Sequence, residues 1–166
     1  MLHGQKSERR AMTVAVVIDT SVWVSAFLNP EGFPARLIQI GKAGNFSLVG
    51  SLPMLDELQE VLLRPRIMKI RGSTATDIEA YMAGVAAVVQ LVPIPGELKL
   101  CRDPNDDVIL ETAIQGNAAY VVSRDEDMTR DLDLIETLRE RGIETITVQR
   151  LIDTLGPNAA TVGHDE

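Results

Sequence analysis

Four acidic residues stand at points where a fold could bring them together. Asp19 ends the apolar run VAVVID, and Asp125 follows the apolar run AAYVVS by one turn. Asp107 stands in the first turn of a helix expected before the second run, and Glu57 lies within another expected helix. Carboxylates that converge repel one another and raise one another's pKa unless a cation offsets them, so convergence would imply a divalent metal. Ligation by oxygen atoms alone favours Mg²⁺ or Mn²⁺ over zinc.

Each acid also has an ordinary structural explanation. Asp19 and Asp125 could simply close loops between strands and helices, and Asp107 could cap a helix or face its dipole. Glu57, like Glu60, could be a solvated helix position. Surface acids usually have no further role, so the ordinary explanation is preferred for each acid taken alone. Only the joint arrangement of the four favours a metal site.

Other residue types that bind metals or act as nucleophiles are scarce in this chain. Cys101 is the single cysteine, which excludes an intrachain disulfide and a cysteine-rich zinc site and is compatible with a reducing compartment. His3 and His164 both fall in polar end segments. With no ordered histidine beside it, Cys101 is interpreted as a small buried side chain rather than a nucleophile.

Two short strands would position Asp19 and Asp125. Residues 14–19 and residues 118–123 are continuous apolar runs, typical of strands buried on both faces of a parallel sheet. In an open α/β sheet the ligand crevice lies beyond the carboxyl ends of the strands. The two acids should therefore reach the same edge of the sheet.

Further strands and helices alternate with these two. Strands are expected at 46–49, 91–94 and 144–148, the second of them at an edge because Pro93 cannot donate a hydrogen bond. Helices are expected where caps, prolines and helical spacing of apolar residues coincide, at 20–29, 34–43, 53–65, 76–89, 105–116, 131–141 and 149–155. Strands separated by helices predict an α/β fold, with a central parallel sheet of four to five strands covered on both faces.

The composition indicates one globular domain. The 166 residues are 45% hydrophobic and 24% charged, which is compatible with an aliphatic core and excludes disorder of the whole chain. A single domain suits this length. We expect a disordered segment at 1–12, the folded domain at 13–156 and a flexible tail at 157–166.

Charge and hydropathy restrict the location and partners. The formal net charge of -8 means that any contact with nucleic acid must be local or mediated by cations. No apolar run approaches the roughly 18–20 residues of a membrane span, and the first twelve residues are polar where a signal peptide would be apolar. We therefore expect a cytoplasmic protein without membrane contact.

Four motifs occur in an order that resembles the PIN domain family. They are VVIDTSVWVSA, LDELQEVLLRP, RDPNDDVILETA and AAYVVSRDEDM, and the resemblance covers about residues 14–155. It is closest to the bacterial PIN ribonucleases that are toxins of toxin–antitoxin systems, the VapC-like proteins. The resemblance implies a Rossmann-like, three-layer α/β/α fold.

The resemblance also implies roles for individual residues. The catalytic acids that it implies are Asp19, Glu57, Asp107 and Asp125. The ligands of Mg²⁺ or Mn²⁺ that it implies are Asp19, Asp107, Asp125 and Asp127. Ser21 and Ser123 match small polar positions that often flank the metal.

Two positions leave choices open. The third motif offers three acids, and Asp107 is preferred because it directly precedes the apolar run VIL, whereas Asp103 before Pro104 suits a turn. Whether Asp103 or Asp106 assists Asp107 stays open. Many relatives have glycine where this chain has Arg124, but a basic residue beside a metal could contact phosphate.

The activity implied by the resemblance is hydrolysis of RNA phosphodiester bonds with one or two divalent cations. The implied partners are the RNA substrate, a cognate antitoxin and a second copy of the chain in a homodimer. One alternative is a PIN fold that binds RNA or protein without catalysis. Another is a phosphohydrolase of the haloacid-dehalogenase type, which is disfavoured because Ser21 stands where that family has a second aspartate.

The run RPRIMKIR is a candidate RNA contact, in addition to Ser21, Ser123 and Arg124. Its basic residues are Arg64, Arg66, Lys69 and Arg71. They could face phosphates, although a solvated helix end and turn explains the run equally well. Trp23 and Phe27 are interpreted as core or dimer contacts rather than base-stacking residues, and exposure in the monomer would favour the dimer.

Overall fold

The central feature of the computed structural model is a five-stranded parallel sheet, within the described residues 13–124 and 132–157. The strand order is β3-β2-β1-β4-β5, with every neighbouring pair parallel. The strands are β1 (Ala15–Ile18), β2 (Ser47–Gly50), β3 (Gln90–Leu91), β4 (Tyr120–Val122) and β5 (Glu144–Ile146). The predicted parallel sheet is confirmed, and Asp19 follows its central strand.

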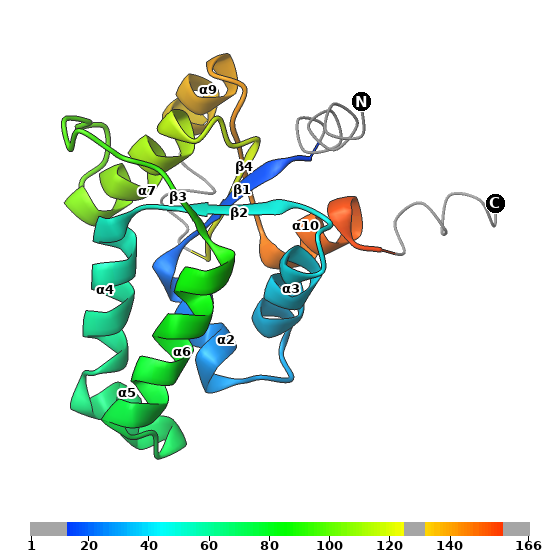
Figure 1. Ribbon diagram of the computed structural model, residues 1–166. Coiled ribbons are helices and arrows are strands. Elements are labelled where there is room, and N and C mark those ends of the chain that lie inside the picture. Colours follow the sequence, from blue (N-terminus) through cyan, green and yellow to red (C-terminus); the bar gives the residue numbers. More distant parts are fainter. Residues whose placement is uncertain (1–12, 125–131, 158–166) are drawn as a thin grey trace, which may run out of the picture.

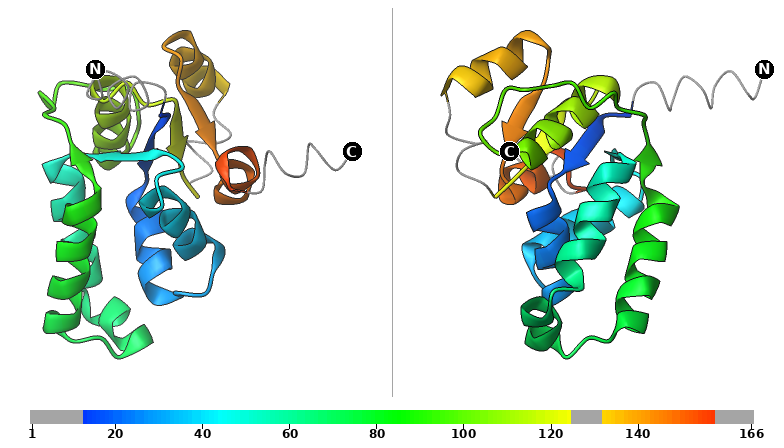
Figure 2. Two further views of the ribbon diagram at one scale, coloured as in Figure 1. Left: turned by 45° about the vertical axis from the view of Figure 1, so that its right-hand side comes forward. Right: turned by 90° about the vertical axis from the view of Figure 1, so that its left-hand side faces the viewer.

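Helices cover both faces of this sheet and extend beyond one edge of it (Figures 1 and 2). Their bounds are α2 (Thr20–Leu28), α3 (Phe33–Lys42), α4 (Leu52–Leu62), α5 (Pro65–Arg71), α6 (Ala75–Val88), α7 (Pro104–Gln115), α9 (Leu132–Glu140) and α10 (Val148–Leu155). The helices α2, α3 and α10 pack on one face, and α7 and α9 cover the other. The predicted three-layer α/β/α fold is thus confirmed.

The alternation of side chains along β1 divides the core between the two faces. Val16 and Ile18 pack with α2 and α3, whereas Val17 packs with α7 on the opposite face. All three of these side chains are buried. The continuous apolar sequence of β1 therefore reflects burial on both faces, as predicted for a central parallel strand.

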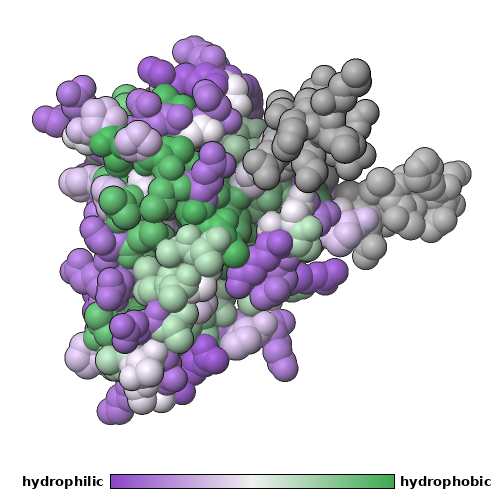
Figure 3. Space-filling view, viewed as in Figure 1, coloured by the Kyte–Doolittle hydropathy of each residue, from purple (hydrophilic) through white to green (hydrophobic). Residues whose placement is uncertain are grey.

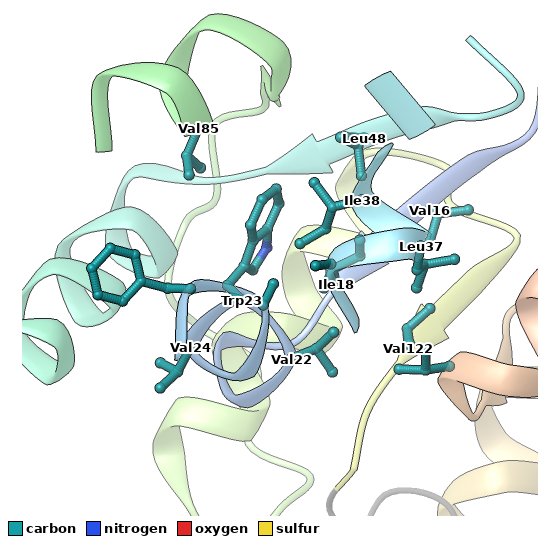
Figure 4. Close-up of a cluster of buried hydrophobic side chains, with 14 of the residues drawn as sticks. Val16, Ile18, Val22, Trp23, Val24, Leu37, Ile38, Leu48, Val85 and Val122 are labelled. Carbon is teal, nitrogen blue, oxygen red and sulfur yellow. The ribbon is translucent and has the colours of Figure 1, made fainter. Parts of the chain in front are cut away.

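Trp23 and Phe27 belong to this core. Figure 4 shows the Trp23 ring lying among apolar side chains that include Ile38 and Val85. The Tyr81 hydroxyl donates to the Trp23 carbonyl at 3.0 Å, and its ring meets the Phe27 ring edge to face, with 4.8 Å between centroids. Both residues are nearly inaccessible, at 5% and 4% exposure, so the exposed dimer contact that we considered for them is wrong.

The arm formed by α4, α5 and α6 differs in one respect from the expectation. The expected stop at Pro65 is wrong: α4 ends at Leu62, and Pro65 begins α5, because Arg64 is extended and proline suits a first helical turn. At the other end of α5, Gly72 adopts a φ of 69°, in the left-handed region that glycine favours. The basic run therefore forms a separate short helix with exposed basic residues, rather than the end of the preceding helix.

Two further boundaries differ from the expectation. The edge strand β3 begins at Gln90 and ends before Pro93, so it is two residues long rather than four. The helix α7 is capped by Asp103, whose side chain accepts from the Asn105 amide at 2.9 Å, and not by Asn105 or Asp106. Pro104 takes the first helical position, so the helix starts one residue before the expected range.

Exposed apolar side chains gather around the short edge strand. Figure 3 shows apolar residues over β3 and the adjoining ends of α4 and α6, where Leu52, Val88 and Leu91 are exposed. A short edge strand offers few unpaired backbone groups to another chain. Among the described helices, none combines the length and apolar character that a membrane span needs. The segments expected to be loose, 1–12 and most of 157–166, lie outside the described residues.

Candidate active site at the carboxyl end of the sheet

A crevice of about 560 Å³ opens beyond the carboxyl end of the central strand β1. Its acidic lining residues come from three distant parts of the chain and are Asp19, Glu57, Asp103 and Asp106. Arg124, which follows β4, is the basic residue of the lining that the structure describes. Asp19 thus lies beyond the carboxyl end of its strand, as the strand-end argument predicts.

Asp19 is held from two directions. Its amide donates to the Val122 carbonyl at 2.9 Å, which continues the pairing of β1 with β4. Its Oδ2 accepts hydrogen bonds from the Ser123 hydroxyl at 2.8 Å and from the Ser21 hydroxyl at 3.1 Å. Asp19 and Ser123 are both buried, at 7% and 1% exposure. The two serines predicted to flank the site therefore orient the Asp19 carboxylate.

Glu57 faces the same crevice from α4, an orientation that the sequence left open. Its Oε2 accepts a hydrogen bond from the Thr20 hydroxyl at 3.2 Å. Burial raises the pKa of Glu57; the Thr20 hydrogen bond opposes the rise, and the negative charge of Asp19 adds to it. Asp103 also raises this pKa and Arg64 lowers it. Glu57 therefore shares an electrostatic environment with the other acids.

Asp106 and Asp107 face different surroundings. Asp106 lines the crevice and is 9% exposed. Asp107 is also buried, but its Oδ1 accepts from the amides of Leu100 and Cys101, both at 2.8 Å. Asp107 is not among the described residues that line the crevice. The third motif therefore contributes Asp106 to the crevice where we expected Asp107.

Helical spacing explains this division of the third motif. Ile109 lies three residues after Asp106 and lines the crevice beside it. Glu111 lies four residues after Asp107, and its carboxylate accepts from the amides of Gly96, Glu97 and Leu98. Residues three or four apart share one helix face. Asp106 and Ile109 therefore share the face of α7 that meets the crevice, whereas Asp107 and Glu111 share the face that meets the loop.

The basic residues predicted to contact RNA are divided among several positions. Arg124 lines the crevice, and its Nη1 donates to the Ser25 hydroxyl at 2.6 Å. Arg64 begins α5 close enough to affect Glu57 electrostatically. Arg71 instead donates to the Phe27 carbonyl at 2.6 Å, so it fastens α5 to α2. The predicted site residues Asp125 and Asp127 lie outside the described residues.

The donor set of the crevice suits a hard cation. Its acids offer oxygen atoms alone, the type of ligand that Mg²⁺ and Mn²⁺ prefer. The charges of Asp19 and Asp103 raise the pKa of Glu57, and a cation would relieve this repulsion. Within residues 13–124 and 132–157, no three acidic, histidine or cysteine side chains are close enough to enclose an ion. The described acids could thus supply part of a ligand set.

Comparison with known proteins points to one family. The PIN domain family matches residues 15–127, which run from β1 through β4 and include the acids of the crevice. An uncharacterized protein of Methanocaldococcus jannaschii is 25% identical over 115 residues, which make up 69% of this chain and 73% of the relative. The match covers more than half of the chain and the elements that build the crevice.

Proposed function

Because the chain belongs to the PIN domain family, whose members are generally nucleases, we propose that it is a divalent-metal-dependent endoribonuclease. Family membership supports a nuclease-type, hydrolytic function. The finer proposal is that the chain hydrolyses phosphodiester bonds of RNA with Mg²⁺ or Mn²⁺. The observation that carries it is the crevice in which Asp19, Glu57 and Asp106 meet beyond the central strand.

Asp19 and Asp106 are the described residues that we propose as metal ligands. Ser21 and Ser123 fix the Asp19 carboxylate, so that it need not reorganise when a cation or substrate enters. Asp125 and Asp127 complete the proposed ligand set on the strength of the family resemblance. When bound, a divalent cation lowers the pKa of water and neutralises charge that develops on the phosphate.

Glu57 is the residue that we propose as the proton acceptor. Burial and the neighbouring acids raise its pKa, so its carboxylate holds a proton more firmly than an exposed glutamate does. A base with a raised pKa is better matched to water near neutral pH. The Thr20 hydroxyl orients this carboxylate toward the crevice from the adjoining helix.

Asp107 takes a positioning role in this proposal instead of the ligand role that we expected. Its carboxylate ties the loop before α7 to the helix through the two amides at Leu100 and Cys101. That loop leads directly into Asp103 and Asp106, which line the crevice. Asp107 therefore supports the acids of the third motif without itself contacting substrate.

Arg124 is the first candidate for contact with the RNA backbone. Its guanidinium lies at the crevice, where it could pair with a phosphate that the acids would otherwise repel. Arg64 and Arg66, which are exposed at the start of α5, are proposed as further phosphate contacts. Local basic contacts of this kind are compatible with a net charge of -8.

The proposed biological setting is a cytoplasmic toxin–antitoxin pair, in which a cognate antitoxin protein and a second copy of the chain are the partners. The support is the sequence resemblance, because Trp23 and Phe27 are buried and offer no dimer surface. Expression of the chain in a bacterial host should stop growth, and Asp19→Asn should not. Growth arrest by both proteins, or by neither, would contradict the toxin proposal.

A cleavage assay on structured and unstructured RNA tests the proposed activity. Wild-type protein should cleave RNA with Mn²⁺ or Mg²⁺ and should lose this activity in a chelator. Asp19→Asn is the matched control, since asparagine still accepts the two serine hydrogen bonds. RNA binding without cleavage in any of these metals would indicate a non-catalytic PIN domain instead.

A further inference from the structure

A second cavity of about 610 Å³ adjoins the crevice of the acids. It lies between the end of α2, the start of α3 and the connection from β5 to α10, and its lining includes Phe33, Arg124 and Gln149. Arg124 lines both cavities, and its hydrogen bond to Ser25 holds the guanidinium at this boundary. A group that binds Arg124 would therefore have neighbours on both sides.

The lining of the second cavity differs in chemistry from the crevice. Arg124 is its charged residue among the residues that the structure describes, and acids are absent from that part of the lining. Phe33, the first residue of α3, is 51% exposed, which is a large fraction for an aromatic side chain. The rest of the lining includes apolar Leu28 and Val148 and polar Asn29, Thr147 and Gln149.

These features of the cavity suit a ligand that has a flat ring with a partly polar edge. Exposed aromatic rings stack on nucleobases, and amide side chains can hydrogen-bond the edges of a base. A cavity with an apolar surface and a few polar groups is typical of sites for molecules of this size. Charge is also complementary, because a nucleotide brings a neutral base beside an anionic phosphate.

We propose that this cavity binds a nucleobase of the RNA strand, next to the phosphate that contacts Arg124. The inference rests on the proposed ribonuclease function. In this arrangement the base stacks on Phe33, its edge faces Gln149 and Asn29, and the strand continues past Arg124 into the crevice of Asp19. The cavity therefore positions the strand, while the acids act on it.

The proposal can be tested on the full chain in chelator, where no cleavage occurs. The probes are adenosine 5′-monophosphate, uridine 5′-monophosphate and ribose 5-phosphate, which has the sugar and phosphate without a base. The nucleotides should bind more tightly than ribose 5-phosphate and should shift the NMR signals of the Phe33 ring and the Gln149 side-chain amide. Equal affinities, or shifts elsewhere alone, would overturn the proposal.

Substitutions at Phe33 sharpen this test. Phe33→Ala should weaken binding of the nucleotides and of a short single-stranded RNA roughly tenfold, whereas Phe33→Trp should retain it. Leu52→Ala is the matched control, because Leu52 is 62% exposed and lies on α4, away from this cavity. Unchanged affinity in Phe33→Ala would overturn the proposal. So would a change in its oligomeric mass by light scattering, which would identify Phe33 as a contact between copies.

Cleavage kinetics separate this inference from the proposed function. If wild-type protein cleaves RNA, Phe33→Ala should raise KM and leave kcat almost unchanged. Cleavage with an unaltered KM in Phe33→Ala would overturn the base site and leave the ribonuclease proposal intact. If the protein binds nucleotides at Phe33 but cleaves no RNA, the base site is supported and the ribonuclease proposal is contradicted.

Discussion

Asp106 and Asp107 are neighbours on α7, yet their carboxylates serve different parts of the molecule. Asp106 lines the crevice beside Asp103, whereas Asp107 accepts two backbone hydrogen bonds from the preceding loop. An α-helix turns about 100° per residue, so one step in sequence is enough to change the face. Substitutions at the two positions should therefore separate activity from stability.

Asp107→Ala should lower the free energy of unfolding by about 1–3 kcal/mol, because the Leu100 and Cys101 amides lose a charged acceptor. Asp107→Asn keeps an acceptor oxygen and should lose less. Urea unfolding measures both variants against wild type. Equal stability of Asp107→Ala and wild type would show that this contact does not hold the loop.

Asp106→Asn should have the opposite profile. It removes a charge from the crevice, so we expect RNA cleavage to fall at least a hundredfold, about 2.7 kcal/mol in the barrier. The melting temperature should stay close to that of wild type. Cleavage rates and thermal unfolding are to be measured on the same samples, with Asp107→Asn beside them. Loss of cleavage in Asp107→Asn but not in Asp106→Asn would restore Asp107 as the third acid.

The pKa of Glu57 should be raised above its ordinary value of 4.5 in the metal-free protein. Burial is the main cause, and the charges of Asp19 and Asp103 contribute to the rise. The folded state then binds the proton more tightly than the unfolded state. The contribution of Glu57 to stability is therefore greatest below pH 4.5 and is lost as pH rises through the raised pKa.

Asp103→Asn tests the electrostatic part of this shift. It removes one negative charge near Glu57, and asparagine still caps α7. NMR titration of the Glu57 carboxyl carbon should give a lower pKa in Asp103→Asn than in wild type. An unchanged pKa in this variant would leave burial as the whole cause.

Arg71 should contribute to stability rather than to RNA binding. Its Nη1 donates to the Phe27 carbonyl, and the guanidinium carbon lies 4.6 Å from the centroid of the Phe27 ring. Arg71→Leu should lower the free energy of unfolding by about 1 kcal/mol and leave RNA affinity almost unchanged. Arg66→Leu is the matched control, and it should weaken RNA affinity and leave the free energy of unfolding almost unchanged. Equal effects of the two variants on RNA affinity would show that α5 binds RNA as a unit.

The fold could be predicted because its signals are local. The strands β1 and β4 are continuous apolar runs, and Gly142 and the proline residues mark where neighbouring helices end or begin. Parallel order then follows from the alternation of strands with helices. The position of Asp19 at the carboxyl end of a central strand was predictable for the same reason.

The facing of side chains on helices could not be predicted in the same way. Glu57 faces Thr20 because α4 packs against α2, a contact between segments 37 residues apart. The choice between Asp106 and Asp107 depends on the rotation of α7 and on a loop whose amides need an acceptor. Arg71 belongs to a run that could face phosphates or be a solvated helix end, but its partner Phe27 lies in a distant helix. Each case is decided by tertiary packing, which a local sequence pattern does not specify.

Asp19→Asn should remove metal dependence from the stability of the fold. Asparagine can accept the hydrogen bonds of Ser21 and Ser123, so the shape of the site is kept while one negative charge is lost. The metal-free variant should melt at the same temperature as wild type or slightly higher, because repulsion with Glu57 falls.

Titration of Mn²⁺ against thermal unfolding measures this effect. Wild type should gain about 2.7 kcal/mol of stability at a Mn²⁺ concentration a hundred times the Kd, and Asp19→Asn should gain much less. Glu136→Gln is the control for charge alone, since it removes one negative charge from the exposed face of α9, and it should shift like wild type. A bound cation would offset the repulsion between the acids of the crevice. Binding of Mn²⁺ should therefore also lower the pKa of Glu57. Equal Mn²⁺ shifts in wild type and Asp19→Asn, or RNA cleavage that persists in chelator, would show that Asp19 does not hold the metal.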